Sequence, residues 1–182
     1  MQKMNYKDVL FDAVVATPGS GKSYLCDKYP EIFVDADEVR LRTKYFVPEG
    51  ITRAELEETK GNRSFEKRFG GDDFLRELNK KLLQEVNLGK VLICSPHPEL
   101  ISFLRQNNLK FCLVYQSKDM YEELKNRMIS RGNNKKFIDE NCKLFDEYYI
   151  KNTTEKDSAV RYEFGHGEYL ENIIRDHFGF KF

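Results

Sequence analysis

The stretch Ala16-Thr-Pro-Gly-Ser-Gly-Lys-Ser-Tyr24 follows directly on the apolar run Phe11-Asp-Ala-Val-Val15. The apolar run predicts a buried strand, and Pro-Gly-Ser-Gly predicts a turn after it. The residues from Lys22 to Lys28 are expected to form a helix that stops before Pro30. A strand, a glycine-rich turn and a helix in this order are the context of a phosphate-binding loop. The pattern departs from its usual form only at Ala16, which stands where the first glycine is expected.

The residue types of this loop suit the binding of a nucleotide. Gly19 and Gly21 allow backbone conformations that a Cβ would block, so that successive N–H groups can face one concavity and hold phosphate oxygens. Lys22 is expected to reach the β- and γ-phosphates of ATP, and the Ser23 hydroxyl to bind Mg²⁺. The alternative is a glycine-rich turn followed by a chance Lys-Ser. The predicted nucleotide-binding residues are Thr17, Pro18, Gly19, Ser20, Gly21, Lys22, Ser23 and Tyr24.

Length and composition limit the classes of protein to consider. The 182 residues fit one domain, and 30 basic residues balance 30 acidic ones, so the net charge is zero. This balance argues against bulk binding of nucleic acid but leaves a local basic patch open. No apolar stretch approaches the roughly 20 residues of a membrane span, and the first residues do not resemble a signal peptide, so a cytoplasmic protein is expected. The four cysteines are far apart, which predicts buried, reduced thiols.

Short apolar runs alternate with helical patterns along the rest of the chain. This alternation predicts an α/β fold with a parallel sheet covered by helices on both faces. Thr52 is expected to cap a further helix. The predicted strands after the first are residues 32–34, 90–94, 111–115 and 158–164, and the predicted helices after the first are residues 35–45, 72–86, 98–107, 118–131, 137–150 and 168–178.

Three local patterns together resemble those of one known family. They are Thr17-Pro-Gly-Ser-Gly-Lys-Ser23, Phe33-Val-Asp-Ala-Asp-Glu-Val-Arg40 and Leu124-Lys-Asn-Arg-Met-Ile-Ser-Arg131. The chain is similar in them to the P-loop kinases, small phosphotransferases that include adenylate, shikimate, gluconate and adenylylsulfate kinases and polynucleotide 5′-kinases. The resemblance implies a three-layer P-loop NTPase fold over residues 1–182, with a five-stranded parallel sheet in the order 2-3-1-4-5. It also implies an acceptor-binding helical insertion at residues 38–89 and a lid at residues 127–150.

Two carboxylates and an arginine follow the predicted second strand. By resemblance, Asp35 would lie near Mg²⁺, and Asp37 near the acceptor, where it would position an attacking hydroxyl or act as a weak base. Arg40, one helical turn further on, could hold an acceptor phosphate or carboxylate through two hydrogen bonds. Since ligands of an open parallel sheet bind at the carboxyl ends of its strands, these residues are expected at the active edge. The alternative is simple helix capping, for which aspartate is common.

Arg127 and Arg131 are four residues apart and would share one face of a helix. In the family, this helix end leads into a lid whose guanidinium groups neutralise charge on the transferred phosphoryl group and whose closure excludes water. The implied catalytic residues are therefore Lys22, Asp37, Arg127 and Arg131. A solvated basic helix end would account for the same two arginines.

The predicted third strand ends at Cys94 and is followed by Ser-Pro-His-Pro98. Many kinases and ATPases carry an aspartate at this point, and this chain does not. Asp35 would then supply that carboxylate, as the resemblance to the shikimate and gluconate kinases implies. Ser95 and His97 fall at the active edge and are candidate acceptor contacts, although His97 also suits loop packing. In the insertion, the basic and aromatic segment Lys60–Gly71 contains Arg63, a further candidate substrate ligand. This segment could hold a phosphate and stack a base, or be a solvated loop.

The residues thus lead us to expect an enzyme that transfers the γ-phosphoryl group of Mg-ATP to a small acceptor. A nucleoside monophosphate is the first expectation, because the insertion is basic, and a polynucleotide 5′-hydroxyl or a small metabolite are alternatives within the same class. An ATPase or nucleotide switch that acts on a protein partner is the alternative of another class. It would need a positioned water and usually an acid on the third strand.

Overall fold

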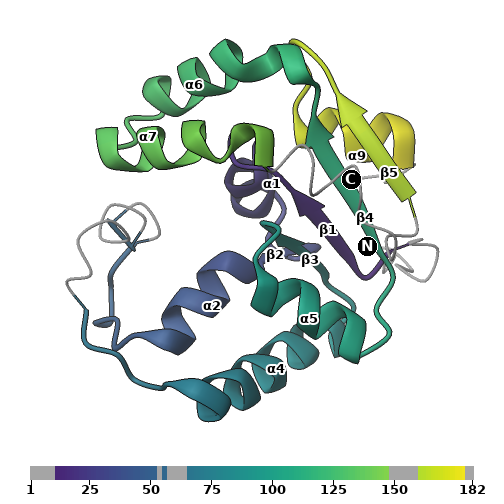
Figure 1. The fold of residues 1–182 in the computed structure, drawn as a ribbon. Helices are drawn as coiled ribbons and strands as arrows, with labels where there is room; N and C mark the ends of the chain where they lie inside the picture. Colours follow the sequence, from purple (N-terminus) through teal and green to yellow (C-terminus); the bar gives the residue numbers. More distant parts are fainter. Residues whose placement is uncertain (1–10, 53–54, 57–64, 148–159, 179–182) are drawn as a thin grey trace.

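The computed structural model describes residues 11–52, 55–56, 65–147 and 160–178. Five parallel strands form one sheet in the order β2-β3-β1-β4-β5 (Figure 1). This parallel sheet and its strand order confirm the prediction. The strands are β1 (Ala13–Ala16), β2 (Phe33–Asp35), β3 (Val91–Cys94), β4 (Phe111–Gln116) and β5 (Val160–Phe164).

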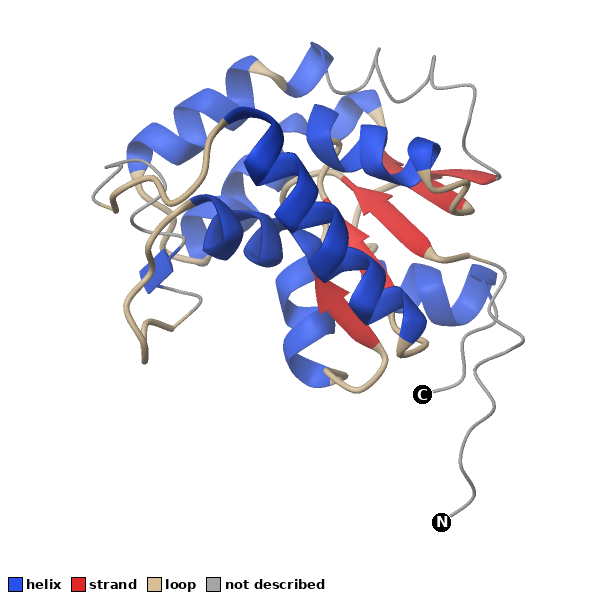
Figure 2. Ribbon diagram, turned by 90° about the horizontal axis from the view of Figure 1, so that it is seen from below, coloured by secondary structure: helices blue, strands red, loops and turns tan. Residues whose placement is uncertain are grey.

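Helices lie on both faces of the sheet (Figures 1 and 2). One hydrophobic cluster joins β1 to α1 and α9, and the other joins β1 to α2, α4 and α5. Val14 belongs to the first cluster and Val15 to the second, so β1 is buried on both faces, as its continuous apolar run predicts. The helices are α1 (Lys22–Lys28), α2 (Ala36–Lys44), α4 (Gly71–Asn87), α5 (Pro98–Gln106), α6 (Tyr121–Ser130), α7 (Lys135–Lys143) and α9 (Leu170–Phe178).

The main differences from the predicted elements concern the two helices between β4 and β5. The first begins with a 3₁₀ turn, Lys118–Met120, before α6. The helix predicted for residues 137–150 begins earlier, because the Asn134 side chain accepts a hydrogen bond of 2.9 Å from the Phe137 N–H and caps α7. α7 ends at Lys143, and residues 148–150 lie outside the described residues. The predicted cap at Thr52 is confirmed, since its hydroxyl oxygen accepts a hydrogen bond of 3.3 Å from the Glu55 N–H, and its own N–H donates to the Glu55 carboxylate over 2.7 Å.

The parallel arrangement brings the carboxyl ends of three strands to one edge. β1 leads there into the glycine-rich loop, β2 into Asp35 and Asp37, and β3 into Ser95. Asp35 pairs in register with Ile93 of β3, and Val15 with Cys94, so these three ends are immediate neighbours. Residues that are far apart in sequence therefore meet at this edge, as expected for an open α/β sheet.

All four cysteines are free thiols, of which Cys26, Cys94 and Cys112 are buried and Cys142 is half-buried. Burial raises the pKa of Cys112 to about 12, and burial together with the Asp37 carboxylate raises the pKa of Cys94. Both thiols therefore stay protonated at neutral pH, and the predicted burial holds for every cysteine except Cys142. No helix in the described part of the chain is both long and apolar enough to span a lipid bilayer.

Candidate active site

Two glycines of the loop between β1 and α1 adopt conformations that disfavour other residues. Gly19 has φ +82° and Gly21 has φ +96°. A Cβ on Gly19 would also lie 3.0 Å from Cδ2 of Leu124 in α6. Gly21 is the N-cap of α1, where no side chain forms a capping hydrogen bond and no acid occupies the first turn. The positive end of the α1 dipole is therefore not neutralised by a carboxylate in the first turn of the helix. This leaves it suited to bind an anion such as phosphate.

The structure explains why alanine is accepted at position 16. Ala16 is the last residue of β1, is 1% exposed, and packs in the hydrophobic cluster beneath α1. Its Cα pairs in register with Val114 of β4. The methyl group therefore lies in the core, away from the loop where phosphate would approach the backbone. The departure from the usual motif falls on the sheet side of the loop.

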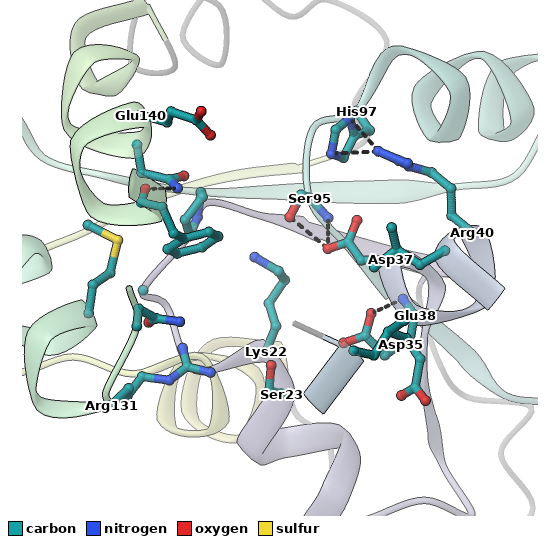
Figure 3. Close-up of a pocket in the computed structure, with 18 of the residues that line it drawn as sticks. Lys22, Ser23, Asp35, Asp37, Glu38, Arg40, Ser95, His97, Arg131 and Glu140 are labelled. Carbon is teal, nitrogen blue, oxygen red and sulfur yellow. Dashed lines mark hydrogen bonds between the residues drawn. The ribbon is translucent and has the colours of Figure 1, made fainter. Parts of the chain in front are cut away.

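A cleft of about 410 Å³ opens at the carboxyl edge of the sheet (Figure 3). One wall comes from the loop and the end of α6 with α7, and the other from α2 and the residues after β3. The structure brings together most of the site residues predicted from sequence. Those that line the cleft are Pro18, Gly19, Lys22, Ser23, Asp35, Asp37, Arg40, Ser95, His97 and Arg131.

Lys22 lies between the two walls, as Figure 3 shows. Its Nζ donates to the carbonyl oxygens of Ala16 over 2.9 Å and Thr17 over 3.1 Å. The side chain is 9% exposed, so the ammonium group is largely shielded from water while it faces the cleft. Its charge is held at the base of the loop, where a phosphate on the loop would meet it.

The two aspartates after β2 have different surroundings. Asp37 Oδ2 accepts from both the Ser95 N–H (3.0 Å) and the Ser95 hydroxyl (2.7 Å), which fixes this carboxylate against the end of β3. Asp35 Oδ1 accepts from the Glu38 N–H over 3.0 Å and caps α2. The capping alternative therefore applies to Asp35 and not to Asp37. Asp35 nevertheless lines the same cleft. A carboxylate has two oxygens, so capping through one of them does not prevent the other from binding a metal ion.

The donor set beside the loop suits a magnesium ion that is shared with phosphate. Ser23 and Asp35 line the cleft together and supply one hydroxyl and one carboxylate. Within the described ranges, no group of three or more His, Cys, Asp and Glu could hold a metal on its own. Mg²⁺ at phosphate sites takes one or two protein ligands and completes its shell with phosphate oxygens and water. The side chains present therefore fit Mg²⁺ only together with a phosphate ligand.

Arg40 and His97 form a pair on the acceptor side of the cleft (Figure 3). Arg40 Nη2 lies 3.0 Å from Nε2 and 3.3 Å from Nδ1 of His97. Burial would raise the pKa of the nearby Glu99, but hydrogen bonding to its own N–H and the charges of Arg40, His97 and Lys44 lower it. Arg40 and Lys44 thus place positive charge near the Glu99 carboxylate at this end of the cleft.

A second hollow, of about 870 Å³, lies on the other side of the loop. Gly21, Tyr24 and Arg127 line it, together with Tyr169 and Asn172 of the α9 region. Tyr24 is 57% exposed and Tyr169 is 46% exposed, so both rings are open to a ligand. Gly19 and Arg131 line both hollows, so the two hollows meet at the loop.

Arg127 faces this second hollow and is tightly held. Its Nη1 donates to the Gly19 carbonyl over 3.4 Å, its Nη2 is hydrogen-bonded to Glu123, and its guanidinium carbon lies 4.0 Å from the Tyr169 ring centre. We did not single out Glu123 or Tyr169 from the sequence. The spacing of four between Glu123 and Arg127 is a signal that could have identified the first of them.

Glu123 also holds the loop after β5. It accepts from His166 Nδ1 over 2.6 Å and from the Gly167 N–H over 3.1 Å. His166 Nε2 lies 3.3 Å from an Asp119 oxygen. Burial would raise the pKa of Glu123, but the hydrogen bonds from Gly167, His166 and Arg127 lower it. Glu123 therefore stays ionised and joins α6 to the loop before α9.

We expect Glu123→Gln to destabilise the protein by about 1–3 kcal/mol, because the buried Arg127 loses its charged partner. The free energy of unfolding in urea measures this effect. Glu122→Gln is the matched control, since that carboxylate is 72% exposed and its nearest lysine is 3.9 Å away. The control should stay within about 0.5 kcal/mol of the wild type. Equal effects in both variants would contradict the role given to Glu123.

The His166 contact should depend on pH. The hydrogen bond to Glu123 and the charges of Asp119 and Glu123 raise the pKa of His166 above 6.5, while desolvation opposes them. A raised pKa adds stability that is complete below 6.5 and is lost as the pH rises through the raised value. The melting temperature of His166→Gln should therefore fall below that of the wild type more at about pH 6 than at about pH 9. A difference independent of pH would refute this expectation.

The remaining predicted residues do not line the first cleft. Thr17 and Ser20 are buried, with 1% and 0% exposure, and contribute to the loop through their backbone. Gly21, Tyr24 and Arg127 line the second hollow. Arg63 lies outside the described residues.

Comparisons with known proteins give no functional assignment. No protein-family model matches the chain, and no curated protein matches it. One solved structure that it matches is an uncharacterized protein from Eubacterium ventriosum ATCC 27560, with 12% identity and a TM-score of 0.48 over 92% of this chain and 96% of that one.

Proposed function

We propose that the protein is an ATP-dependent phosphotransferase of the P-loop kinase type, which transfers the γ-phosphoryl group of Mg-ATP to an acceptor. The observation that carries the proposal is a single cleft with two opposed sets of groups. Ser23 and the glycine-rich loop lie on one side, Lys22 extends from that side toward the middle, and Asp37, fixed by Ser95, lies on the other side (Figure 3). A donor phosphate and an acceptor atom could therefore meet between them.

The residues have distinct roles under this proposal. The loop N–H groups and Lys22 bind the phosphates, while the base occupies the second hollow beside Tyr24 and Tyr169. Ser23 and Asp35 would hold Mg²⁺, which supplies charge neutralisation at the phosphates. Arg131 lines both hollows and can stabilise charge on the phosphoryl group in transfer. Arg127 acts from the opposite side of the loop, where Gly19 and Glu123 hold it.

The acceptor side of the cleft is where Asp37 and the Arg40–His97 pair lie. Asp37 would orient the attacking oxygen, and Arg40 would bind an anionic part of the acceptor. A nucleoside monophosphate is the first acceptor that the sequence leads us to expect, and a polynucleotide 5′-hydroxyl or a small metabolite are alternatives. All of these acceptors would react with ATP bound in the same way. They would differ only in their contacts with the wall formed by α2 and the residues after β3.

An ATPase or a nucleotide-dependent switch is the candidate of another class. Such proteins need a positioned water and usually an acid at the end of the third strand. Here β3 is followed by Ser95, and both hydrogen-bond donors of Ser95 are directed to Asp37. The carboxylate beside the reacting phosphate is therefore Asp37, a residue of α2. It faces a cleft large enough for an acceptor. These features support transfer to an acceptor over hydrolysis.

ADP formation with Mg²⁺, with and without acceptors, tests the proposal. The acceptors are nucleoside monophosphates, 5′-hydroxyl oligonucleotides and small hydroxylated metabolites. We expect ADP only in the presence of one acceptor class and in amounts equal to the phosphorylated product. The same rate of ADP formation without any acceptor would instead favour an ATPase.

A further inference from the structure

A cluster of aromatic and basic side chains lies where α2 ends, beyond the acceptor side of the cleft. We name it the acceptor rim and define it by Lys44, Phe46, Arg68 and Phe69. The Arg68 guanidinium carbon lies 5.8 Å from the Phe46 ring centre and 5.2 Å from that of Phe69. Lys44 Nζ lies 5.5 Å from the ring centre of Phe74 in α4. Phe46 is 55% exposed, so a large apolar ring is open to solvent beside a cation.

Backbone hydrogen bonds hold the two segments of the acceptor rim together. The Phe46 N–H donates to the Glu66 carbonyl, and the Arg68 N–H donates to the Lys44 carbonyl, both over 2.9 Å. These bonds flank an antiparallel bridge between Tyr45 and Lys67. The exposed ring and the guanidinium group are therefore presented from paired backbone, which fixes their relative position before any ligand binds.

The cations of the acceptor rim continue a row that begins inside the cleft. Arg40 and Lys44 are four residues apart on α2 and both line the cleft. The helical rise separates them by about 6 Å along the axis, and the segment of Arg68 is hydrogen-bonded to the Lys44 backbone. Neither Lys44 nor Arg68 forms a direct ion pair with another side chain in the described part of the chain. Their charges are thus available to a ligand with successive phosphates.

Next to Arg40, at the end of the cleft near the loop, the surroundings of Asp37 favour an uncharged nucleophile on the acceptor. Asp37 lines the cleft next to the loop, so a phosphate nucleophile there would meet a carboxylate, whereas the neighbouring Glu38 is paired with Arg42. A hydroxyl group can instead donate a hydrogen bond to Asp37. The first phosphate of the acceptor would then lie further out, at Arg40. A hydroxyl followed by successive phosphates, with a base on each sugar, is the arrangement of groups at the 5′ end of an unphosphorylated strand.

We propose that the acceptor rim binds single-stranded nucleic acid and directs its 5′-hydroxyl end to Asp37. Arg40 and Lys44 contact the first phosphates, and a base stacks on Phe46 beside Arg68. Such a combination of a basic track with exposed aromatic rings is how proteins bind single strands. The inference rests on the proposed function, and it selects the polynucleotide end among the acceptors considered above.

The reaction balances with ATP as the only co-substrate. The 5′-oxygen forms a bond to the γ-phosphorus of ATP, and the bond from that phosphorus to the β,γ-bridging oxygen breaks. ADP leaves with the bond's electron pair. The hydroxyl proton passes to Asp37 and then to solvent. The products are ADP, a 5′-phosphorylated strand and one proton.

Binding of a fluorescent 5′-hydroxyl hexanucleotide, measured by anisotropy without ATP, tests the rim separately from catalysis. Phe46→Ala and Arg68→Ala should each weaken binding about 5- to 100-fold. The matched controls are Leu88→Ala, at the C-cap of α4 and 74% exposed, and Arg76→Ala in α4, whose side chain is 79% exposed. They should change binding less than about twofold. Equal loss in the controls, or no binding by the wild type, would overturn the inference.

Phosphorylation of the same oligonucleotide separates this inference from the proposed function. Transfer to the oligonucleotide, with KM raised in the two rim variants and unchanged in the controls, supports both. Binding that depends on the rim, without transfer to any acceptor, supports the rim as a binding site and contradicts the phosphotransferase. Transfer to a nucleoside monophosphate, with the oligonucleotide neither bound nor phosphorylated, supports the phosphotransferase and overturns the inference.

Discussion

Lys22→Ala is expected to lower the turnover number for phosphoryl transfer by about 10²–10³-fold or more while the protein stays folded. The Lys22 ammonium is the cation that the loop holds at the centre of the cleft, and alanine leaves no positive charge there. The carbonyls of Ala16 and Thr17 lose their donor, so the free energy of unfolding should fall by about 1–3 kcal/mol. Steady-state kinetics and urea unfolding measure the two effects.

Lys22→Met is the control for packing, because methionine keeps an unbranched stem of similar length without the charge. We expect it to be as inactive as Lys22→Ala and closer to the wild type in stability. Turnover at the wild-type rate in either variant would show that the loop is not the phosphate site.

Asp37→Asn is expected to lower the turnover number by about 10²–10⁴-fold with little change in ATP affinity. The amide oxygen of asparagine can still accept from the Ser95 N–H and hydroxyl, so the side chain keeps its position. What is lost is the negative charge that attracts the acceptor proton. Kinetics at saturating ATP and direct ATP titration separate the two parameters.

Ser95→Ala tests the positioning of Asp37 independently. It removes the 2.7 Å hydroxyl bond and leaves the 3.0 Å bond from the Ser95 N–H, so a smaller loss of rate than in Asp37→Asn is expected. If Asp37→Asn instead lost ATP affinity and rate equally, Asp37 would belong to the metal site, and its assignment to the acceptor would be wrong.

The core of the fold could be predicted from sequence because its signals are local. The apolar run of β1, the glycines at positions 19 and 21, and the apolar run at residues 32–34 each predict one element. Parallel topology then brings Asp37 and Ser95 to one edge, although they are 58 residues apart. The start of α7 was missed because its cap, Asn134, follows another asparagine in a polar loop that offers several equivalent starts.

Other parts of the site depend on tertiary contacts that leave no pattern in the sequence. Arg40 and His97 are 57 residues apart and belong to different elements. The bridge between Tyr45 and Lys67 joins segments with no strand-like alternation, so the acceptor rim could not be assembled in advance. The Arg127 contact with Tyr169 likewise depends on how α9 packs beside the loop.

The fate of the γ-phosphoryl group tests the central claim most directly. ATP labelled at the γ-phosphate is incubated with Mg²⁺, the protein and each acceptor in turn, with Lys22→Ala as the inactive control. We predict that the label moves to one acceptor class in an amount equal to the ADP formed, and that Lys22→Ala transfers it at least about 10²-fold more slowly. Label that appears only as inorganic phosphate, at a rate that no acceptor changes, would contradict the assignment as a phosphotransferase.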